Sequence, residues 1–351
     1  MHKKIYYSFR KNSLKNPIYL IFFVTNSCNA RCNHCFYSNQ LNINQKDILT
    51  LEQINDFSKQ LGKIVWLAIS GGEPFLRNDL EKIYELFCDN NKIEDLNLPT
   101  NGVLTDVIYE KAKYMLNSRK IKNFNIVLSL DGTKEIHNQI RGIDCFENVF
   151  KTYEKLIELK KDHSNLLIKV NTTLSNNNIH VIPDLIKYVW EKMSGIDFHN
   201  FEIMRGNPKN PGYLPPTTEQ LEEIKPLIFK TWEHYAFFGK KDLKSKIAIN
   251  AKKFLFNSYI KTLKEKRQLF PCYAGKVHAV LDYNGDIFLC ELGPKIGNIK
   301  EQSFKEVWNS ENANIERKKI MNKECYCTHS CFQNTNVSFN QKLWPKLFFG
   351  D

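Results

Sequence analysis

The sequence predicts an α/β fold built on parallel β-strands. Strand-like and helix-like segments alternate from residue 18 to about residue 205. Repeated strand, helix, strand units of this length form parallel sheets with right-handed crossovers, and the helices cover the outer face. The chain has 351 residues, more than one average hydrophobic core, so we expect a main domain and a smaller second one.

Six strands and the helices between them are expected in the main domain. The strand candidates, rich in β-branched or apolar residues, are Tyr19–Val24, Ile64–Ser70, Glu94–Pro99, Asn125–Ser129, Leu166–Leu174 and Phe198–Met204. The amphipathic runs between them are Leu51–Leu61, a run ending at Phe87, Val107–Asn117, Cys145–Lys160 and Ile179–Glu191. Thr50 and Gln53 form a capping-box pattern, and Asn78 or Asp79 is expected to cap the second helix.

A helical connector and a β-hairpin are predicted next. Four prolines interrupt the chain between residues 206 and 216, and amphipathic patterns then predict helices over Thr218–Tyr235 and Asp242–Gln268. We expect Trp232 and Tyr235 to pack the C-terminal region onto the main domain, with a substrate cleft as the alternative. The remaining predicted elements are a hairpin of Val277–Leu281 and Asp286–Leu289, joined by an Asn-Gly turn, and a short helix over Phe304–Trp308.

The formal net charge of +12 raises the question of nucleic-acid binding. The excess is mostly lysine dispersed along the chain, and no RNA-binding aromatic motif accompanies it. We therefore expect a solvated basic surface and no nucleic-acid partner. A basic face also suits an acidic electron donor of the flavodoxin or ferredoxin type.

No segment of the sequence reads as a membrane or export signal. The apolar run Ile18–Val24 has seven residues, whereas a membrane-spanning helix needs about 20. The N-terminus is basic but lacks the apolar region and cleavage site of a signal peptide. The ten cysteines are then expected in the reducing cytoplasm, where metal binding is commoner than disulfide formation.

Three of these cysteines, Cys28, Cys32 and Cys35, follow the first predicted strand. Each iron of a cubane 4Fe–4S cluster takes one protein ligand, so three thiolates leave one iron open for a substrate. A zinc site is an alternative, but structural zinc usually closes with four ligands, and His34 inside the run makes an awkward tetrahedron. A disulfide framework belongs to short secreted chains.

With Phe36 or Tyr37 after the third cysteine, this C-x3-C-x2-C run resembles the hallmark of the radical SAM superfamily. The resemblance implies a partial (β/α)6 barrel. It also implies a 4Fe–4S cluster that binds S-adenosylmethionine (SAM) at its open iron, and a 5′-deoxyadenosyl radical that abstracts hydrogen from a substrate. The reactive groups of such folds collect at the carboxyl ends of the strands, where this loop begins.

Later strand ends carry further family motifs. Gly71-Gly72-Glu73-Pro74 looks like the GGEP motif, which implies contact with the amino group of SAM; a tight turn is the plain alternative. Asn101 lies in a T-N-G turn, although Asn-Gly turns are common on their own. The pattern S-x-D-G followed by H-x-x-x-R-G implies that a serine and an arginine hold the SAM ribose and carboxylate. The further residues predicted to bind the cofactor on this basis are Ser129, Asp131 and Arg141. Asn171, on the fifth predicted strand, is added because the barrel register would turn it toward the same mouth.

Five C-terminal cysteines resemble the twitch or SPASM extension of radical SAM enzymes, an α+β unit that holds auxiliary iron–sulfur clusters. Two complete clusters need about seven cysteines, so we expect one auxiliary 4Fe–4S cluster. Its predicted ligands are Cys272, Cys290, Cys327 and Cys331. Cys325 is a possible substitute ligand and a candidate hydrogen donor; no other catalytic residue is predicted. Four thiolates also suit zinc, which is the rival here.

The resemblance divides the chain into four parts: an N-terminal lead-in (1–16), a radical SAM core (17–205), a helical connector (206–268) and a SPASM or twitch domain (269–351). We expect an enzyme that oxidises, cross-links or epimerises a peptide or protein. The alternative substrate is a carbohydrate or a nucleotide-linked small molecule. The alternative of another class is a non-catalytic iron–sulfur or zinc-binding protein.

Overall fold

The computed structural model describes residues 2–11, 13–239 and 242–350. Its strands form one nine-stranded sheet in the order β6-β5-β4-β3-β2-β1-β7-β8-β9. Strands β1 to β6 pair in parallel, as the alternation of strands and helices predicted. The strand bounds are β1 Tyr19–Thr25, β2 Trp66–Gly71, β3 Asp95–Thr100, β4 Asn123–Ser129, β5 Leu166–Leu174, β6 Phe198–Ile203, β7 His278–Leu281, β8 Asp286–Phe288 and β9 Lys295–Asn298.

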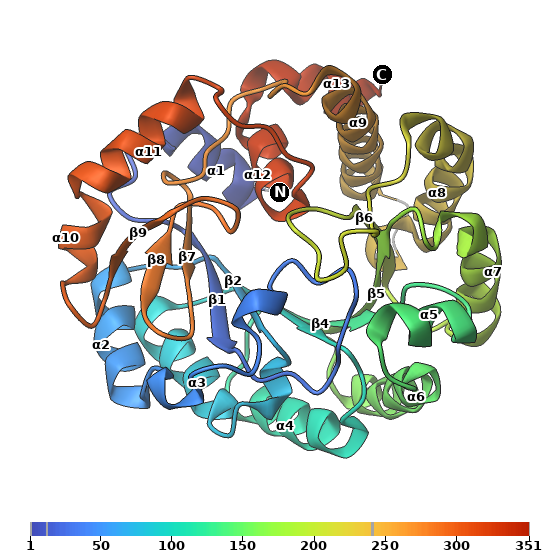
Figure 1. The fold of residues 1–351 in the computed structure, drawn as a ribbon, viewed down its shortest axis with the longest axis horizontal. Coiled ribbons are helices and arrows are strands. Elements are labelled where there is room, and N and C mark those ends of the chain that lie inside the picture. Colours follow the sequence, from blue (N-terminus) through green and yellow to red (C-terminus); the bar gives the residue numbers. More distant parts are fainter. Residues whose placement is uncertain (1, 12, 240–241, 351) are drawn as a thin grey trace.

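The first six strands curve into an arc with helices on its outer side (Figure 1). Within the described residues β6 pairs only with β5, so the arc is a partial barrel, as predicted. The helix bounds are α1 His2–Arg10, α2 Leu51–Leu61, α3 Leu80–Asn91, α4 Thr105–Ser118, α5 Lys134–Arg141, α6 Phe146–Asp162, α7 Ile182–Lys192, α8 Thr218–Gly239, α9 Leu243–Glu265, α10 Phe304–Trp308, α11 Glu311–Met321, α12 Ser330–Phe339 and α13 Trp344–Phe349.

The C-terminal hairpin continues the main sheet. Strand β7 pairs in parallel with β1, and Tyr19 lies opposite His278 in this register. Strands β8 and β9 then add antiparallel pairs. The extension predicted for residues 269–351 therefore shares its sheet with the core, because β1 offers β7 a free edge on the side away from β2.

Several elements were not predicted. Helix α5 is only eight residues long, too short for a clear hydrophobic period, although Gly142 just after it takes the left-handed conformation typical of a helix end.

Helix α2 has the predicted capping box between Thr50 and Gln53. Asp79 precedes α3 without a side-chain capping bond; its carboxylate pairs with Arg77 instead.

Aromatic side chains hold the connector and the extension against the core. Trp232 of α8 is 2% exposed and donates its indole N–H to the carbonyl of His199 in β6 (3.1 Å), so it packs as core and does not line a cleft. Phe304 of α10 is 1% exposed and meets Phe57 of α2 edge to face, with 5.3 Å between ring centroids. None of the helices in the described part of the chain has the length and apolar character needed to cross a membrane.

Replacing Phe304 with Ala is expected to destabilise the protein by about 3–5 kcal/mol, because it empties a buried ring site where the extension meets the core. Thermal unfolding followed by circular dichroism measures the effect. The matched control is Phe349→Ala, since that ring is 87% exposed. Equal melting temperatures for the two variants would contradict the packing role of Phe304.

Candidate functional site

The loop that follows β1 carries Cys28, Cys32 and Cys35 and is held by the turn that follows β2. The backbone N–H of Gly72 donates to the carbonyl of Thr25 (2.8 Å), and that of Glu73 donates to the carbonyl of Ser27 (2.8 Å). A Cβ on Gly71 or Gly72 would lie 2.2 Å from those same carbonyl oxygens. Only glycine permits this approach, so the paired glycines have a structural reason independent of any ligand.

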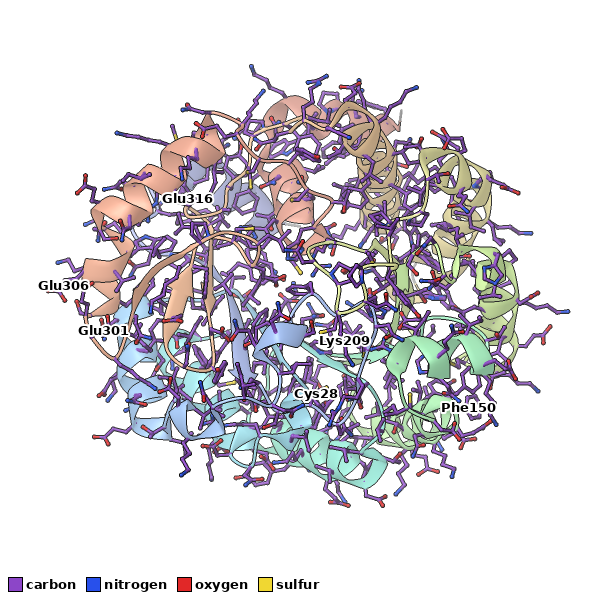
Figure 2. The ribbon with its side chains drawn as sticks, viewed as in Figure 1. Cys28, Phe150, Lys209, Glu301, Glu306 and Glu316 are labelled. Atoms are coloured by element: carbon purple, nitrogen blue, oxygen red, sulfur yellow. The ribbon has the colours of Figure 1, made fainter. Side chains whose placement is uncertain are left out.

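Helix α5 holds the loop from the other side. Arg31 N–H donates to the carbonyl of Arg141 (2.9 Å), and Asn33 N–H donates to that of Ile140 (2.8 Å). The side chain of Asn42 bonds both the N–H (3.0 Å) and the carbonyl (3.2 Å) of Cys28. Figure 2 shows Cys28 near the centre of the view, inside the ring of helices. The three cysteines therefore sit on a loop whose path is set by its neighbours.

Backbone hydrogen bonds and burial act in opposite directions on the pKa values of the loop cysteines. Cys28 accepts a backbone N–H from Ala30, and Cys35 accepts one from Tyr37, in each case two residues further along the chain. Burial nevertheless raises the pKa of Cys28 to about 11 and that of Cys35 to about 12, and the neighbouring thiols of the loop raise both further. A cationic metal centre would supply the charge that keeps such thiols ionised, and N–H donors to sulfur are typical of iron–sulfur ligands.

Arg141, at the end of α5, lies between the cysteine loop and the end of β4. Its guanidinium pairs with the buried carboxylate of Asp131 (2.6 Å) and lies 3.7 Å from Cys32 Sγ. Burial alone would lower the pKa of Arg141, but Asp131 and Cys32 raise it above its usual value. Its Nε is buried without a hydrogen-bond partner. A guanidinium beside Cys32 is the kind of group that pairs with a carboxylate such as that of SAM.

Asp131 itself is occupied by the protein. One carboxylate oxygen accepts the backbone N–H of Thr173 (2.9 Å), and the other carries the pair with Arg141. Burial would raise the pKa of Asp131, but the Arg141 cation holds it below its usual value. The structure therefore shows Asp131 positioning Arg141, while direct contact with SAM stays a prediction.

Glu73 is likewise engaged with the protein. Its buried carboxylate accepts the hydroxyl of Thr100 (2.9 Å) and the backbone N–H of Asn101 (2.8 Å). Burial raises the pKa of Glu73 to about 7, against these hydrogen bonds. The Asn101 amide donates to Asn29 in the cysteine loop (2.7 Å). Glu73 and Asn101 thus tie the ends of β2 and β3 to the loop, and their predicted binding of SAM is untested, as is that of Pro74.

Ser129, the last residue of β4, lies opposite Asn171 in the second half of β5. Asn171 accepts a hydrogen bond from Asn200 of β6 (2.7 Å). Both predicted residues are partly exposed, so they remain candidates for ligand contact at the same edge as Arg141.

An ionic network of largely buried side chains runs from the end of β6 into the C-terminal extension. Arg205 pairs with Glu202 (3.0 Å) and with Glu291 (3.3 Å). Glu291 also meets His329, and the hydroxyl of Ser330 donates to Glu202 (2.6 Å). Burial would raise the pKa of Glu291, but His329 and Arg205 lower it to about 2. The guanidinium of Arg205 lies 5.2 Å from the centre of the Phe36 ring, directly after Cys35.

The signal for this network was weak in the sequence. Glu291 and His329 each stand within two residues of a predicted cluster ligand, but a single Glu or His near a cysteine is common in any chain. Only the fold brings β6 to these residues.

The predicted auxiliary ligands lie between the hairpin and α12. Cys272 accepts a backbone N–H from Ala274 and Cys290 one from Leu292, which repeats the pattern at Cys28 and Cys35. Burial raises the pKa of Cys272 to about 11, and the thiols of Cys327 and Cys325 raise it further, so these cysteines are neighbours. The Gln333 amide donates to Cys327 Sγ (3.4 Å).

Cys331 has different surroundings. Burial raises its pKa to about 12, nearby carboxylates add to the rise, and the hydroxyl of Tyr19 bonds its sulfur. Cys325 is exposed. Its predicted roles as a substitute ligand and a hydrogen donor stay predictions, as does the choice of four ligands.

Among the described residues, no three Cys, His, Asp or Glu side chains converge on a point where they could hold one metal ion. The other two cysteines contact ordinary side chains: Cys88 bonds Tyr84, and Cys145 Sγ lies 3.3 Å from His137.

Both the sequence and the fold are similar to known proteins. Residues 22–188 match the profile of the Radical SAM superfamily, and residues 272–332 match SPASM, an iron-sulfur cluster-binding domain. The chain is 26% identical over 322 residues to the AdoMet-dependent heme synthase of Methanosarcina barkeri, covering 86% of this chain and 84% of the relative. It is 30% identical over 239 residues to the probable GTP 3′,8-cyclase of Methanococcus aeolicus, covering 66% and 71%. Among solved structures, SuiB of Streptococcus suis bound to precursor peptide SuiA superposes with a TM-score of 0.62 at 16% identity, covering 90% of this chain and 70% of SuiB.

Replacing Cys32 with Ala is expected to remove about four of about eight irons per chain after anaerobic reconstitution, because the first cluster loses a ligand. Formation of 5′-deoxyadenosine with dithionite should then stop. Cys88→Ala is the matched control and should keep both iron and SAM cleavage. Full cleavage activity in Cys32→Ala would show that the loop does not hold the reactive cluster.

Replacing Arg205 with Met is expected to destabilise the protein by about 3–5 kcal/mol, because Glu202 and Glu291 stay buried without their cation. The control is Arg119→Met, which removes an exposed pair with Asp89 (2.8 Å) and should change stability by about 1 kcal/mol or less. Thermal unfolding of the two variants measures the change in stability that each substitution causes. A similar small change in both would mean that the network does not join the two parts.

Proposed function

Because the chain belongs to the radical SAM superfamily, we propose that it abstracts hydrogen from a peptide or protein substrate and thereby oxidises, cross-links or epimerises it. The protein is an enzyme of this superfamily and uses a 4Fe–4S cluster, SAM and an auxiliary iron–sulfur cluster. When bound, the first cluster and SAM supply a 5′-deoxyadenosyl radical through one-electron cleavage of a carbon–sulfur bond. The residues of the chain bind and orient these groups.

Cys28, Cys32 and Cys35 would hold three irons of the first cluster and leave the fourth for SAM. Arg141 would bind the SAM carboxylate through its guanidinium, which lies 3.7 Å from Cys32 Sγ, with Asp131 fixing the guanidinium in place. The close contact of Gly71 and Gly72 with the Thr25 and Ser27 carbonyls would hold the cluster loop beside the turn whose sequence motif implies contact with the SAM amino group. Each of these roles rests on the position of a side chain or glycine that the sequence motif also marks.

The observation that carries the substrate class is the polar inner face of β4 to β6. Side chains alternate along these strands, and the apolar ones, such as Ile168 and Val170, pack in the core beneath the helices. The opposite face carries Asn171 and Asn200, both partly exposed, beside Glu202, whose carboxylate is engaged by Arg205 and Ser330. Amide groups suit hydrogen bonding to the backbone of a peptide. SuiB, whose fold this chain shares, binds a precursor peptide, which adds support.

A nucleotide-linked small molecule is the second candidate. It is favoured by the 30% identity to the probable GTP 3′,8-cyclase of Methanococcus aeolicus. The same amides would then bind a base or a sugar.

The test compares the two substrate classes under identical conditions. Reconstituted enzyme, SAM and dithionite are incubated with peptides encoded by the short reading frames that flank its gene, or with GTP and nucleotide sugars. We expect a peptide to raise 5′-deoxyadenosine formation at least about tenfold, a stimulation worth about 1.4 kcal/mol, and to change in mass. Stimulation by GTP or a nucleotide sugar alone would overturn the peptide proposal.

A variant of the auxiliary site separates radical formation from product formation. Cys290→Ala should retain uncoupled SAM cleavage, because the first cluster is untouched, and should lose the modified peptide. Mass spectrometry of the peptide measures the product. Full product yield in this variant would refute an essential auxiliary cluster.

A further inference from the structure

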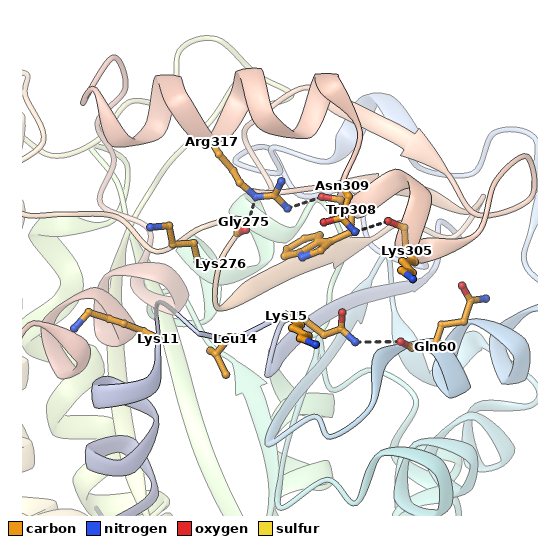
Figure 3. Close-up of a pocket in the computed structure, with 11 residues that line it drawn as sticks. Lys11, Leu14, Lys15, Gln60, Gly275, Lys276, Lys305, Trp308, Asn309 and Arg317 are labelled. Carbon is orange, nitrogen blue, oxygen red and sulfur yellow. Dashed lines mark hydrogen bonds between the residues drawn. The ribbon is translucent and has the colours of Figure 1, made fainter.

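A basic pocket of about 690 Å³ opens where the N-terminal segment, α2 and the C-terminal extension meet (Figure 3). None of its eleven lining residues is acidic, and five carry positive charge. We call Lys11, Lys15, Lys276, Lys305 and Arg317 the basic pocket residues. Polar amides of Asn16, Gln60 and Asn309 complete its rim.

The basic pocket residues lie close together, and no acidic side chain among the described residues lines the pocket between them. Within the described part of the chain, Lys15, Lys276 and Lys305 make no ion pair. Lys11 donates to the carbonyls of Ser8 (3.0 Å) and Phe339 (2.9 Å). Burial lowers the pKa of Lys11, and the charge of Lys276 lowers it further. Like charges gathered in a hollow attract an anionic partner from solution.

The pocket lies at the end of the sheet opposite the reactive cluster. Lys15 precedes β1, Gln60 precedes β2, and Lys276 precedes β7, and these three strands run in parallel. The Cys28 loop instead follows the carboxyl end of β1. A strand of seven residues separates the two ends by roughly 20 Å. A partner in this pocket is therefore remote from the atoms that react with SAM.

The pocket does adjoin the auxiliary site. Cys272 accepts the backbone N–H of Ala274, and the next two residues, Gly275 and Lys276, form the pocket wall. Arg317 fixes this wall by donating to the carbonyl of Gly275 (2.7 Å). Surface charge and a predicted ligand of the auxiliary cluster are thus only a few residues apart.

We propose that the basic pocket residues form the docking site of an acidic one-electron carrier protein of the flavodoxin type. A carrier docked there would lie nearer to Cys272, a predicted ligand of the auxiliary cluster, than to the Cys28 loop. The carrier would lose one electron and a cluster held at Cys272 would gain it; no bond would form or break and no proton would move. The proposal rests on the proposed function only in placing a cluster at Cys272. The pocket could also attract a small free anion, but binding of such an anion would not explain why the pocket lies so close to Cys272. We therefore favour a redox protein as the occupant.

The first test measures binding of oxidised flavodoxin to the holoenzyme by isothermal titration calorimetry. Lys276→Glu/Lys305→Glu should weaken binding at least about tenfold, and binding by the unaltered protein should weaken as salt rises from about 20 to about 200 mM. Lys120→Glu/Lys161→Glu is the matched control, since both lysines are exposed and far from the pocket in sequence. An equal loss of flavodoxin affinity in the two double variants would show that binding depends only on the net charge of the protein, and it would overturn the proposed docking site.

The second test measures how fast each protein is reduced, from the bleaching of its iron–sulfur absorbance. The pocket variant should be slow with reduced flavodoxin and normal with dithionite. The variant Lys15→Glu/Lys305→Glu changes two exposed residues away from Cys272. It should likewise be reduced slowly by flavodoxin and normally by dithionite, and it controls for a folding defect caused by the change at Lys276. Normal reduction by flavodoxin in both variants would overturn the proposal, as would binding of GTP or an acidic peptide at these lysines without any binding of flavodoxin. Peptide modification driven by dithionite does not depend on the pocket, so failure of the docking site and failure of the peptide proposal are distinguishable.

Discussion

The close backbone contact between the loop after β1 and the glycine turn after β2 is the constraint on which the site depends. Carbonyls of Thr25 and Ser27 lie where a Cβ of Gly71 or Gly72 would stand, so no side chain is tolerated there. This contact, together with the end of α5, fixes the path of the cysteine loop before any metal is bound. A preformed loop would let the three predicted thiolate ligands receive a cluster with little reorganisation.

The second constraint is the buried ionic network around Arg205. It joins the end of β6 to residues next to Cys290 and Cys331, so the core and the extension share charges that neither can satisfy alone. Breaking such a set leaves an uncompensated buried charge. The pairing of β1 with β7 in one sheet also joins the core to the extension, in this case through backbone hydrogen bonds. The relative position of the two cysteine groups is thereby determined by two independent kinds of interaction.

The two ends of the parallel strands have different chemical character. The carboxyl end gathers Arg141, the cysteine loop and the polar inner face of β5 and β6, where a substrate and SAM would meet. The amino end of β1 and β7 gathers lysines beside the Cys272 loop. A division of this kind separates electron exchange from a reactive radical, since water and partner proteins stay away from the chemistry.

The sequence by itself determined the parallel strands and the radical SAM superfamily, and it predicted the cysteines of both groups, because period, spacing and short motifs are local properties. It indicated Arg141 but not the helix that carries it, since α5 is too short to show a period. It marked Glu73 and Asp131 as cofactor residues, which stays a prediction, and the tertiary structure adds that their carboxylates bond to Asn101 and Arg141. The network of Arg205 and the unpaired lysines of the pocket were decided only by the fold. They bring together residues from distant segments, and no local pattern in a chain records which distant charges will be buried together.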